Sequence, residues 1–342
     1  MEDKKNTIAE IVNKSLFIDS ERTQPAPLIT ILDKVILTEN NFITISGLPK
    51  SRKTTFMQFF IASCITGQKY IDIQANIDKN DKIVLIDTEQ SEYDFYKQNK
   101  FLKRIIEKNT TPAKFSAYLF REYDPEIILA SIYEIAETQR PKIIFIDNLT
   151  ELAINPNDIA EAKKIIQFLK KLTNKFNLSV VCLLHLSKGG GFTLGNLGSY
   201  ADRGAQSVLK VTLDKETDFS TLECSMLRSD AHFLPLAIRY SEDEKKYVPA
   251  DYTAPQTNKK QKFSMANFTT AEITARMDII FEMQPTYIYA ALVENLKKVF
   301  GVGDTAVKQT IIPVLTIEKY IYTHNKEYHY YKNEVKTKPK KK

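Results

Sequence analysis

The chain has 342 residues, of which 43% are hydrophobic and 26% are charged, and it contains 3 cysteines. This composition is typical of a folded globular protein and argues against a disordered chain or a disulfide-rich secreted domain. No apolar run approaches the ~20 residues that cross a bilayer, and the first residues lack a secretory signal. We therefore expect a cytoplasmic protein with no membrane partner.

The basic residues gather toward the C-terminus. Residues 253–342 contain 15 Lys or Arg and 8 Asp or Glu, whereas residues 1–252 contain 33 and 34. The net charge of +6 therefore divides into +7 for the last part of the chain and −1 for the rest. Such an uneven distribution predicts that the C-terminal part contacts nucleic acid or another acidic surface.

A polar leader is predicted at residues 1–27. The first motif follows a strand predicted at residues 42–46 and precedes a helix predicted at residues 54–66. Gly47, Lys53 and Thr54 match the first glycine, the lysine and the hydroxyl residue of the P-loop pattern G-x-x-x-x-G-K-[ST]. In such a turn, N–H groups and the helix N-terminus bind phosphates, the lysine reaches the terminal phosphates, and the hydroxyl is placed for Mg²⁺. The predicted ATP site comprises Gly47, Leu48, Pro49, Lys50, Ser51, Arg52, Lys53, Thr54 and Thr55.

Arg52 stands where the P-loop pattern has its second glycine. A side chain disfavours the backbone conformations that glycine supplies, although a basic side chain beside phosphates is electrostatically favourable. The alternative interpretation of this segment is an ordinary basic strand-to-helix turn.

Residues 83–87 predict a second buried strand, which continues into Thr88 and Glu89. A carboxylate just beyond the carboxyl end of a strand lies where ligands bind in open α/β folds. Glu89 is therefore the candidate general base that deprotonates the water attacking the terminal phosphate. Asp87 competes for this role, and a helix-capping or surface role is the alternative for Glu89.

A helix predicted at residues 125–138 precedes a third strand at residues 143–147, and a helix at residues 158–176 precedes a fourth strand at residues 178–184. Continuous apolar strands separated by helices predict an α/β fold with a mainly parallel sheet covered on both faces. The third strand ends in Asp147, as is typical of the carboxylate that supports Mg²⁺, and Asn148 is expected to share that site. His185 ends the fourth strand and is a candidate sensor of the terminal phosphate, although a lone histidine is usually structural.

Five of the ten glycines lie at residues 189–198, which predicts a mobile loop rather than a helix or strand. Beyond it, residues 206–213, 220–227 and 234–240 predict short strands that extend the sheet in antiparallel fashion. The main domain is thus expected at residues 28–250, followed by a linker at residues 251–268.

A second, smaller domain is predicted at residues 269–334. The pattern predicts a DNA-binding winged helix-turn-helix. It consists of a helical segment from Thr286, a turn at residues 301–304, a helix at residues 305–317 and a hairpin around Asn325. Pro313 is expected to interrupt or kink the second helix. A helical subdomain for oligomer contacts is the alternative, and the basic tail at residues 335–342 is expected to contact phosphates.

The motifs occur in the order found in RecA-like P-loop ATPases of the hexameric helicase branch. They are the P-loop, the segments 85–89 and 143–147, and His185 before a glycine-rich stretch. The chain resembles this family over residues 28–240 and is most similar to plasmid RepA-like and AAA_25-type ATPases. The resemblance implies a bacterial protein that forms a homo-oligomeric ring of six subunits and hydrolyses ATP with Mg²⁺ at subunit boundaries.

The resemblance also implies roles for individual residues. Lys53 and Thr54 would bind the phosphates and Mg²⁺, Glu89 would activate water, and Asp147 would support Mg²⁺. His185 would couple hydrolysis to movement of residues 187–204, which would face single-stranded DNA in the channel of the ring.

Related helicases use a Lys-x-Arg pair on a late strand to reach the ATP of the neighbouring subunit. The corresponding segment, Met226-Leu227-Arg228, keeps only the arginine, so Arg228 is a candidate trans finger. Arg203, from the glycine-rich region, is an equal candidate.

The function expected from the resemblance is that of a RepA-like replicative or mobilisation helicase of a plasmid or mobile element. Arg52 and the added winged helix leave open an ATP-switched DNA-binding regulator or loader without unwinding activity. A degenerate ATPase that serves as a scaffold is the third alternative.

Overall fold

The computed structural model describes residues 25–187, 193–250, 263–265 and 268–331, and the chain divides into two compact units, residues 1–253 and 254–342. The predicted leader, the predicted basic tail and most of the predicted linker lie outside the described residues. Each unit is described by itself below.

A nine-stranded sheet forms the centre of the first unit, with the strand order β12-β11-β10-β9-β3-β8-β7-β5-β6 over the described residues. The strands from β9 to β6 run parallel, and β10, β11 and β12 continue the sheet in antiparallel fashion. The predicted α/β fold with an antiparallel extension is therefore confirmed. The strands are β3 (Phe42–Gly47), β5 (Ile83–Asp87), β6 (Phe115–Leu119), β7 (Ile143–Asp147), β8 (Ser179–His185), β9 (Ser207–Leu213), β10 (Ser220–Leu227), β11 (Leu236–Ser241) and β12 (Lys246–Pro249).

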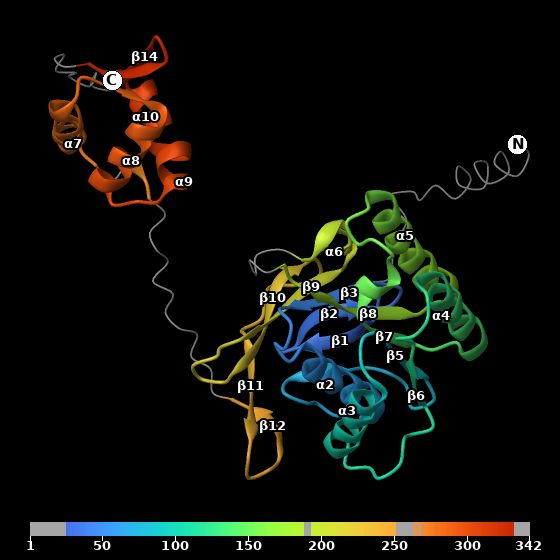
Figure 1. Cartoon of the computed structure of the whole chain (residues 1–342). Coiled ribbons are helices and arrows are strands. Elements are labelled where there is room, and N and C mark those ends of the chain that lie inside the picture. Colours follow the sequence, from blue (N-terminus) through green and yellow to red (C-terminus); the bar gives the residue numbers. More distant parts are fainter. Residues whose placement is uncertain (1–24, 188–192, 251–262, 266–267, 332–342) are drawn as a thin grey trace, which may run out of the picture. The chain divides into compact units, whose positions relative to one another are not determined.

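Both faces of the sheet are covered (Figure 1). On one face lie α2 (Lys53–Thr66), α3 (Glu92–Ile105) and a small sheet of β2 (Lys34–Thr38), β1 (Pro27–Ile31) and β4 (Ile73–Ala75). On the other face lie α4 (Pro125–Gln139), α5 (Ile159–Phe176) and α6 (Gly195–Gly204). Strand side chains alternate between the two cores, so Phe145 joins the first and Ile144 the second. This double burial explains why the strands are continuously apolar in sequence.

The loop predicted at residues 189–198 falls partly on residues 189–192, which lie outside the described residues, and the prediction was wrong for its C-terminal part, because α6 begins at Gly195. Leu197 and Ala201 are buried, and Asp202 accepts hydrogen bonds from Thr44 (3.0 Å) and Thr193 (2.9 Å). A Cβ atom at Gly198 would lie 2.5 Å from the Cβ of Thr193. Gly198 therefore allows a close helix contact rather than mobility.

The second unit contains α7 (Thr270–Met283), β13 (Thr286–Ile288), α8 (Tyr289–Phe300), a helical segment from α9 (Asp304–Ala306) through a π turn (Val307–Ile311) to α10 (Ile312–Ile317), and the strands β14 (Ile321–His324) and β15 (Glu327–Tyr330). The three strands form a sheet in the order β13-β15-β14. Phe263, Met265 and Phe268, from the range assigned to a linker, pack in its core.

Local chemistry explains several features of this unit. Asn325 and Lys326 have positive φ angles of 48° and 66°, as the two-residue turn of a tight hairpin requires. The π turn ends just before Pro313, whose ring prevents a regular helical hydrogen bond at the place predicted. The helix predicted from Thr286 begins instead at Tyr289, because Thr286 pairs with His329 of β15.

Among the helices of the described residues, none has both the length and the apolar character required to span a membrane.

Truncating a strand residue buried between layers should destabilise the first unit. We expect Ile144→Ala to lower its free energy of unfolding by about 2–5 kcal/mol, because Ile144 is fully buried against the α4 and α5 side of the sheet. The same substitution at Ile154, which is 77% exposed, should change it by less than about 0.5 kcal/mol. Denaturant titration monitored by circular dichroism measures both, and equal effects would contradict this assignment of the core.

Candidate nucleotide site at the carboxyl edge of the sheet

Four neighbouring parallel strands bring the predicted site residues to one edge of the sheet. Gly47 at the end of β3 pairs in register with His185 at the end of β8, and Asp87 at the end of β5 pairs with Asp147 at the end of β7. Because β8 pairs with β7, all four strand ends lie together. This is the edge where open α/β sheets bind ligands.

The turn after β3 is built for close backbone approach. A Cβ atom at Gly47 would lie 2.5 Å from Ser51 Oγ and 2.8 Å from the carbonyl oxygen of Val211, so a side chain is excluded there. Lys50 and Arg52 both have positive φ angles, 64° and 72°. The buried Ser51 Oγ has no hydrogen-bond partner among the described residues, so it remains available to a polar ligand in the turn.

Arg52 adopts the left-handed conformation that the glycine of the P-loop pattern normally supplies, and its side chain points away from the turn. The guanidinium forms an ion pair with Asp218 (2.5 Å) and donates to the carbonyl oxygen of Asp218 (2.7 Å). It also lies over the ring of Tyr247, 5.2 Å from the centroid. These contacts offset the cost of about 1–2 kcal/mol that a side chain incurs in the left-handed region.

Lys53 is buried at the first turn of α2, and its ammonium has three acceptors. It donates to the carbonyl oxygens of Gly47 (3.0 Å) and Leu48 (3.1 Å) and lies 3.3 Å from Nδ1 of His185. Burial lowers the pKa of Lys53, whereas the negative charges of Asp147 and Glu89 oppose that shift.

Two buried carboxyl groups lie at the ends of β5 and β7. Burial raises the pKa of Asp147 to about 7, with a further contribution from the like charge of Asp87. Burial also raises the pKa of Asp87 to about 6, although its Oδ1 accepts the N–H groups of Glu89 (3.0 Å) and Gln90 (2.9 Å). Asp87 Oδ2 has no partner among the described residues. Asp87 thus holds the turn that carries Glu89.

Glu89 belongs to a hydrogen-bonded chain that crosses the site. Its Oε2 lies 3.1 Å from Nε2 of His185, whose Nδ1 faces the Lys53 ammonium. An ammonium can only donate, so Nδ1 of His185 accepts and Nε2 carries the proton donated to Glu89. The hydrogen bond from His185 is the main cause that lowers the pKa of Glu89, and Asn148 adds a weaker one (3.4 Å).

The residues suited to Mg²⁺ are Thr54 and Asp147, since Thr54 Oγ1 donates to Asp147 Oδ2 across 2.7 Å. The described residues contain no group of three or more His, Cys, Asp or Glu side chains able to hold a metal ion. Mg²⁺ in nucleotide sites uses one or two protein oxygens together with waters and substrate phosphates. The pair of Thr54 and Asp147 therefore fits this ion.

Arg203 and Arg228 lie at the other edge of the sheet. Arg228 follows Leu227, which pairs with Ser207 at the start of β9, whereas Val211 further along β9 pairs with Gly47. Arg228 donates to the carbonyl oxygen of Arg203, whose own guanidinium donates to Ser199 (2.9 Å). The structure thus brings the two arginines to each other but not to the nucleotide site of their own chain.

Several contributors to the site were missed by sequence reasoning. Thr88 bridges β5 and β7 by donating to the carbonyl oxygen of Asn148 (3.0 Å) and accepting its N–H (2.8 Å). Asp218 and Tyr247 anchor Arg52 from positions far along the chain. A surface aspartate and a strand tyrosine carry no sequence signal for such a role.

A P-loop after a central parallel strand, with a hydroxyl beside the carboxylate at the end of β7, defines a RecA-like P-loop ATPase. The family profile described as AAA domain (AAA_25) matches residues 9–191, more than half of the chain, and the chain belongs to this family. No curated protein matches the sequence. Among solved structures, the KaiC-like protein PH0186 from Pyrococcus horikoshii OT3 is similar over 63% of this chain and 91% of that one, with 15% identity and a TM-score of 0.46.

The anchor of Arg52 should matter only while residue 52 carries a side chain. We expect Asp218→Ala to weaken ATP binding about 3- to 10-fold, because the left-handed turn loses about 1 kcal/mol of support. In an Arg52→Gly background, the same change should have less than about a twofold effect, since glycine adopts this conformation freely. Isothermal titration with a non-hydrolysable ATP analogue measures both, with Glu216→Ala in the same turn as control. Equal effects in the two backgrounds would disprove the anchor.

The raised pKa of Asp147 predicts a pH-dependent stability in the absence of nucleotide and metal. Between about pH 4 and pH 7, folded Asp147 retains a proton that the unfolded chain has lost, so its contribution to stability falls as pH rises. Asp147→Asn mimics the protonated form and should remove this contribution. The unfolding free energy of the wild type minus that of the variant should therefore decrease across this window. Denaturant titrations in EDTA measure the difference, and a constant or rising difference would contradict the assignment.

Proposed function

We propose that the protein is an ATP-hydrolysing, DNA-binding motor, a ring-forming RepA-like replicative or mobilisation helicase of a bacterial plasmid or mobile element. The observation that carries this proposal is the meeting of Lys53, the Thr54–Asp147 pair and Glu89 at one sheet edge. Phosphoryl transfer to water needs a cation against the phosphate charge, a support for the metal ion and a proton acceptor. Lys53, the Thr54–Asp147 pair and Glu89 supply these in that order.

Hydrolysis can be written from these groups. Lys53 exchanges its carbonyl acceptors for the terminal phosphates, and the backbone N–H groups after Gly47 hold them in place. Glu89 accepts a proton from the attacking water. The oxygen of that water bonds to the terminal phosphorus, and the bond between this phosphorus and the departing ADP breaks. Thr54 and Asp147 are the residues that would hold Mg²⁺, which would supply positive charge against the developing phosphate charge.

His185 is proposed as the sensor of this step. It contacts both Lys53 and Glu89, so a change in either charge alters its hydrogen bonds. It also ends β8, and the carbonyl oxygen of His185 accepts the N–H of Leu194 just before α6. Changes at the phosphate site can thus reach residues 187–204, proposed to contact DNA.

A ring is supported by the position of the two arginines. Arg203 and Arg228 lie at the sheet edge opposite their own nucleotide site, which supports a role at the site of another molecule. Head-to-tail contacts of this kind form a ring when the rotation between subunits closes, and an open filament when it does not. We propose a hexamer in which one of these arginines acts on the neighbour's ATP.

The second unit is proposed to be a winged helix that binds DNA. In this unit the helices precede the β14–β15 hairpin, and β13 joins the hairpin as a third strand. Winged-helix modules use this order of elements. We propose that this unit selects or holds duplex DNA while single-stranded DNA occupies the channel.

An ATP-switched DNA-binding regulator or loader is the second candidate function. It is favoured by the hydrogen bond of His185 to Glu89, which lowers the pKa of Glu89 and makes it a weaker base. A protein with such a site would bind ATP to change its assembly and turn it over slowly.

The motor function predicts ATP turnover stimulated by single-stranded DNA. We expect Lys53→Ala to abolish ATP binding and Glu89→Gln to lower turnover about 10²- to 10⁴-fold with ATP binding retained, because a general base contributes that much. Phosphate release with and without single-stranded DNA, together with the mass of the assembly, measures these effects. Glu126→Gln, at an exposed site on α4, is the matched control.

Strand separation distinguishes the two candidates. A motor separates a forked duplex in the presence of ATP, and Glu89→Gln stops it. Turnover without any strand separation, with DNA binding unchanged in Glu89→Gln, would refute the helicase and favour the regulator.

A further inference from the structure

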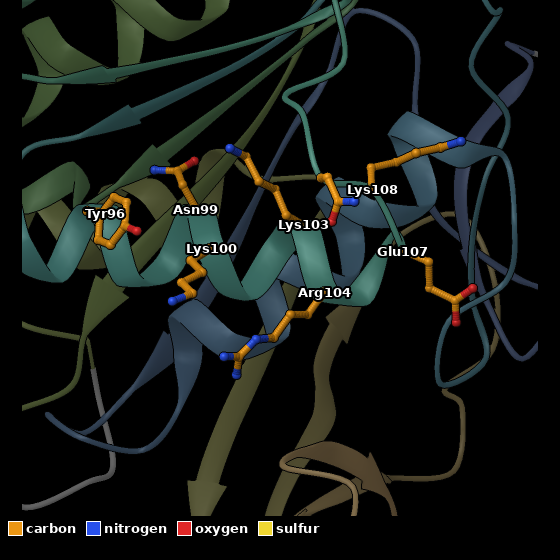
Figure 2. Close-up of a pocket in the computed structure, with 8 residues that line it drawn as sticks. Tyr96, Asn99, Lys100, Lys103, Arg104, Glu107 and Lys108 are labelled. Atoms are coloured by element: carbon orange, nitrogen blue, oxygen red, sulfur yellow. The ribbon is translucent and has the colours of Figure 1, made fainter.

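A basic surface lies on α3, outside the nucleotide site. An open pocket of about 540 Å³ runs along this helix and its C-terminal end (Figure 2). Its lining includes Tyr96, Asn99, Lys100, Lys103, Arg104 and Lys108. We call these six residues the α3 basic surface.

The cations of the α3 basic surface are not neutralised by their surroundings. Lys100, Lys103, Arg104 and Lys108 form no ion pair with any described residue, and Glu107 is the one carboxylate in the lining. By contrast, Lys97 on the same helix is paired with Asp94 at 3.2 Å. Keeping several unpaired cations side by side is unfavourable unless an anion joins them.

The arrangement of these side chains is linear. Tyr96, Lys100 and Arg104 are spaced four residues apart, so they stand on successive helical turns about 6 Å apart along the axis. In Figure 2, Lys100 and Arg104 extend to one side of α3, and Asn99 and Lys103 extend to the other. Cations thus line both sides of a strip that begins at an exposed tyrosine.

These features match a nucleic-acid backbone better than other anions. A small-molecule site is enclosed and carries few charged groups, whereas this strip is open and has four cationic side chains in its lining. A membrane-binding helix leaves its apolar face free for lipid, but Leu102 of α3 and its apolar neighbours pack into the core of the unit. Lysine and arginine with an exposed tyrosine are the side chains that hold phosphates and stack on bases.

We propose that the α3 basic surface binds the phosphodiester backbone of a nucleic acid, in addition to the DNA contacts proposed for residues 187–204 and for the C-terminal unit. This inference rests on the proposed DNA-dependent ATPase, since it adds a DNA contact to the ATPase unit itself. It assigns to a helix of that unit a role that the charge distribution had suggested only for the C-terminal part.

The position of α3 also connects this contact to ATP chemistry. Ser91, two residues after Glu89, caps the helix by accepting the N–H of Asp94 (3.2 Å). Phe101 packs edge-on against Tyr247 (5.8 Å between centroids), the ring that supports Arg52. The helix therefore begins close to the candidate base along the chain and contacts the ring that supports Arg52, so DNA bound there can alter turnover.

The test uses the full chain carrying Lys100→Ala and Arg104→Ala together. The probes are a fluorescent single-stranded oligothymidylate and a duplex of the same length, titrated by anisotropy between about 50 and 200 mM salt. Loss of two phosphate contacts should weaken binding about tenfold or more and reduce the salt slope by about 1.4 for the single strand. Because the proposed contact is to the backbone, the duplex should show a similar loss of affinity.

The matched control carries Lys170→Ala and Lys171→Ala, which remove two charges from a basic pocket between α4 and α5 of the same unit. It should bind both probes like the wild type, and both variants should keep the wild-type melting temperature and the basal ATP turnover. DNA stimulation of turnover should fall in the α3 variant alone.

The possible failures are distinguishable. Wild-type-like binding and salt slope in the α3 variant, or equal losses in the α3 variant and the control, would overturn this inference and leave the proposed function intact. A wild-type chain that hydrolyses ATP but binds neither probe would remove the DNA component of the proposed function and this inference with it. A chain that binds DNA without hydrolysing ATP would refute the ATPase and leave the α3 contact measurable.

Discussion

The parallel register of β3, β8, β7 and β5 is the constraint on which the site depends. Because these strands run in one direction and end level with one another, the residues at their ends share a single edge of the sheet. The strands themselves are buried on both faces, so the polar groups at their ends lie next to a dry interior. Charges there are poorly solvated, which explains why the pKa values of Asp87 and Asp147 rise while that of Lys53 falls.

These perturbed groups are tied together in a way that leaves them ready to exchange partners. The Lys53 ammonium uses backbone carbonyls and a histidine nitrogen as acceptors, and the Thr54 hydroxyl uses the Asp147 carboxylate. A nucleotide with its metal ion offers phosphate oxygens to the Lys53 ammonium and a cation to the Thr54 hydroxyl and the Asp147 carboxylate. Stabilisation lost by breaking the internal contacts is thus recovered in the complex, and preorganised donors in a buried site are worth more than the same donors in water.

Arg52 shows how a departure from a motif can be accommodated by tertiary contacts. Glycine is usual at this position because the turn needs a left-handed residue, and here that conformation carries a long cationic side chain. Asp218 and Tyr247 hold this side chain away from the phosphate turn, so the replacement need not close the site. The same contacts join the turn to the antiparallel part of the sheet, and through Phe101 to α3, which makes the additional strands part of the nucleotide site's support.

The sequence alone determined the alternation of apolar strands and helices, the P-loop turn and the carboxylates at the strand ends, because periodicity, turn residues and motif spacing are local properties. It could not determine the helix at Gly195–Gly204, since glycine composition indicates a loop unless the close contact with Thr193 is known. It also could not join Arg52 to Asp218, orient His185 between Lys53 and Glu89, or bring Arg203 next to Arg228. Those relations depend on strand order and register between segments far apart in the chain, and only the tertiary structure decides them.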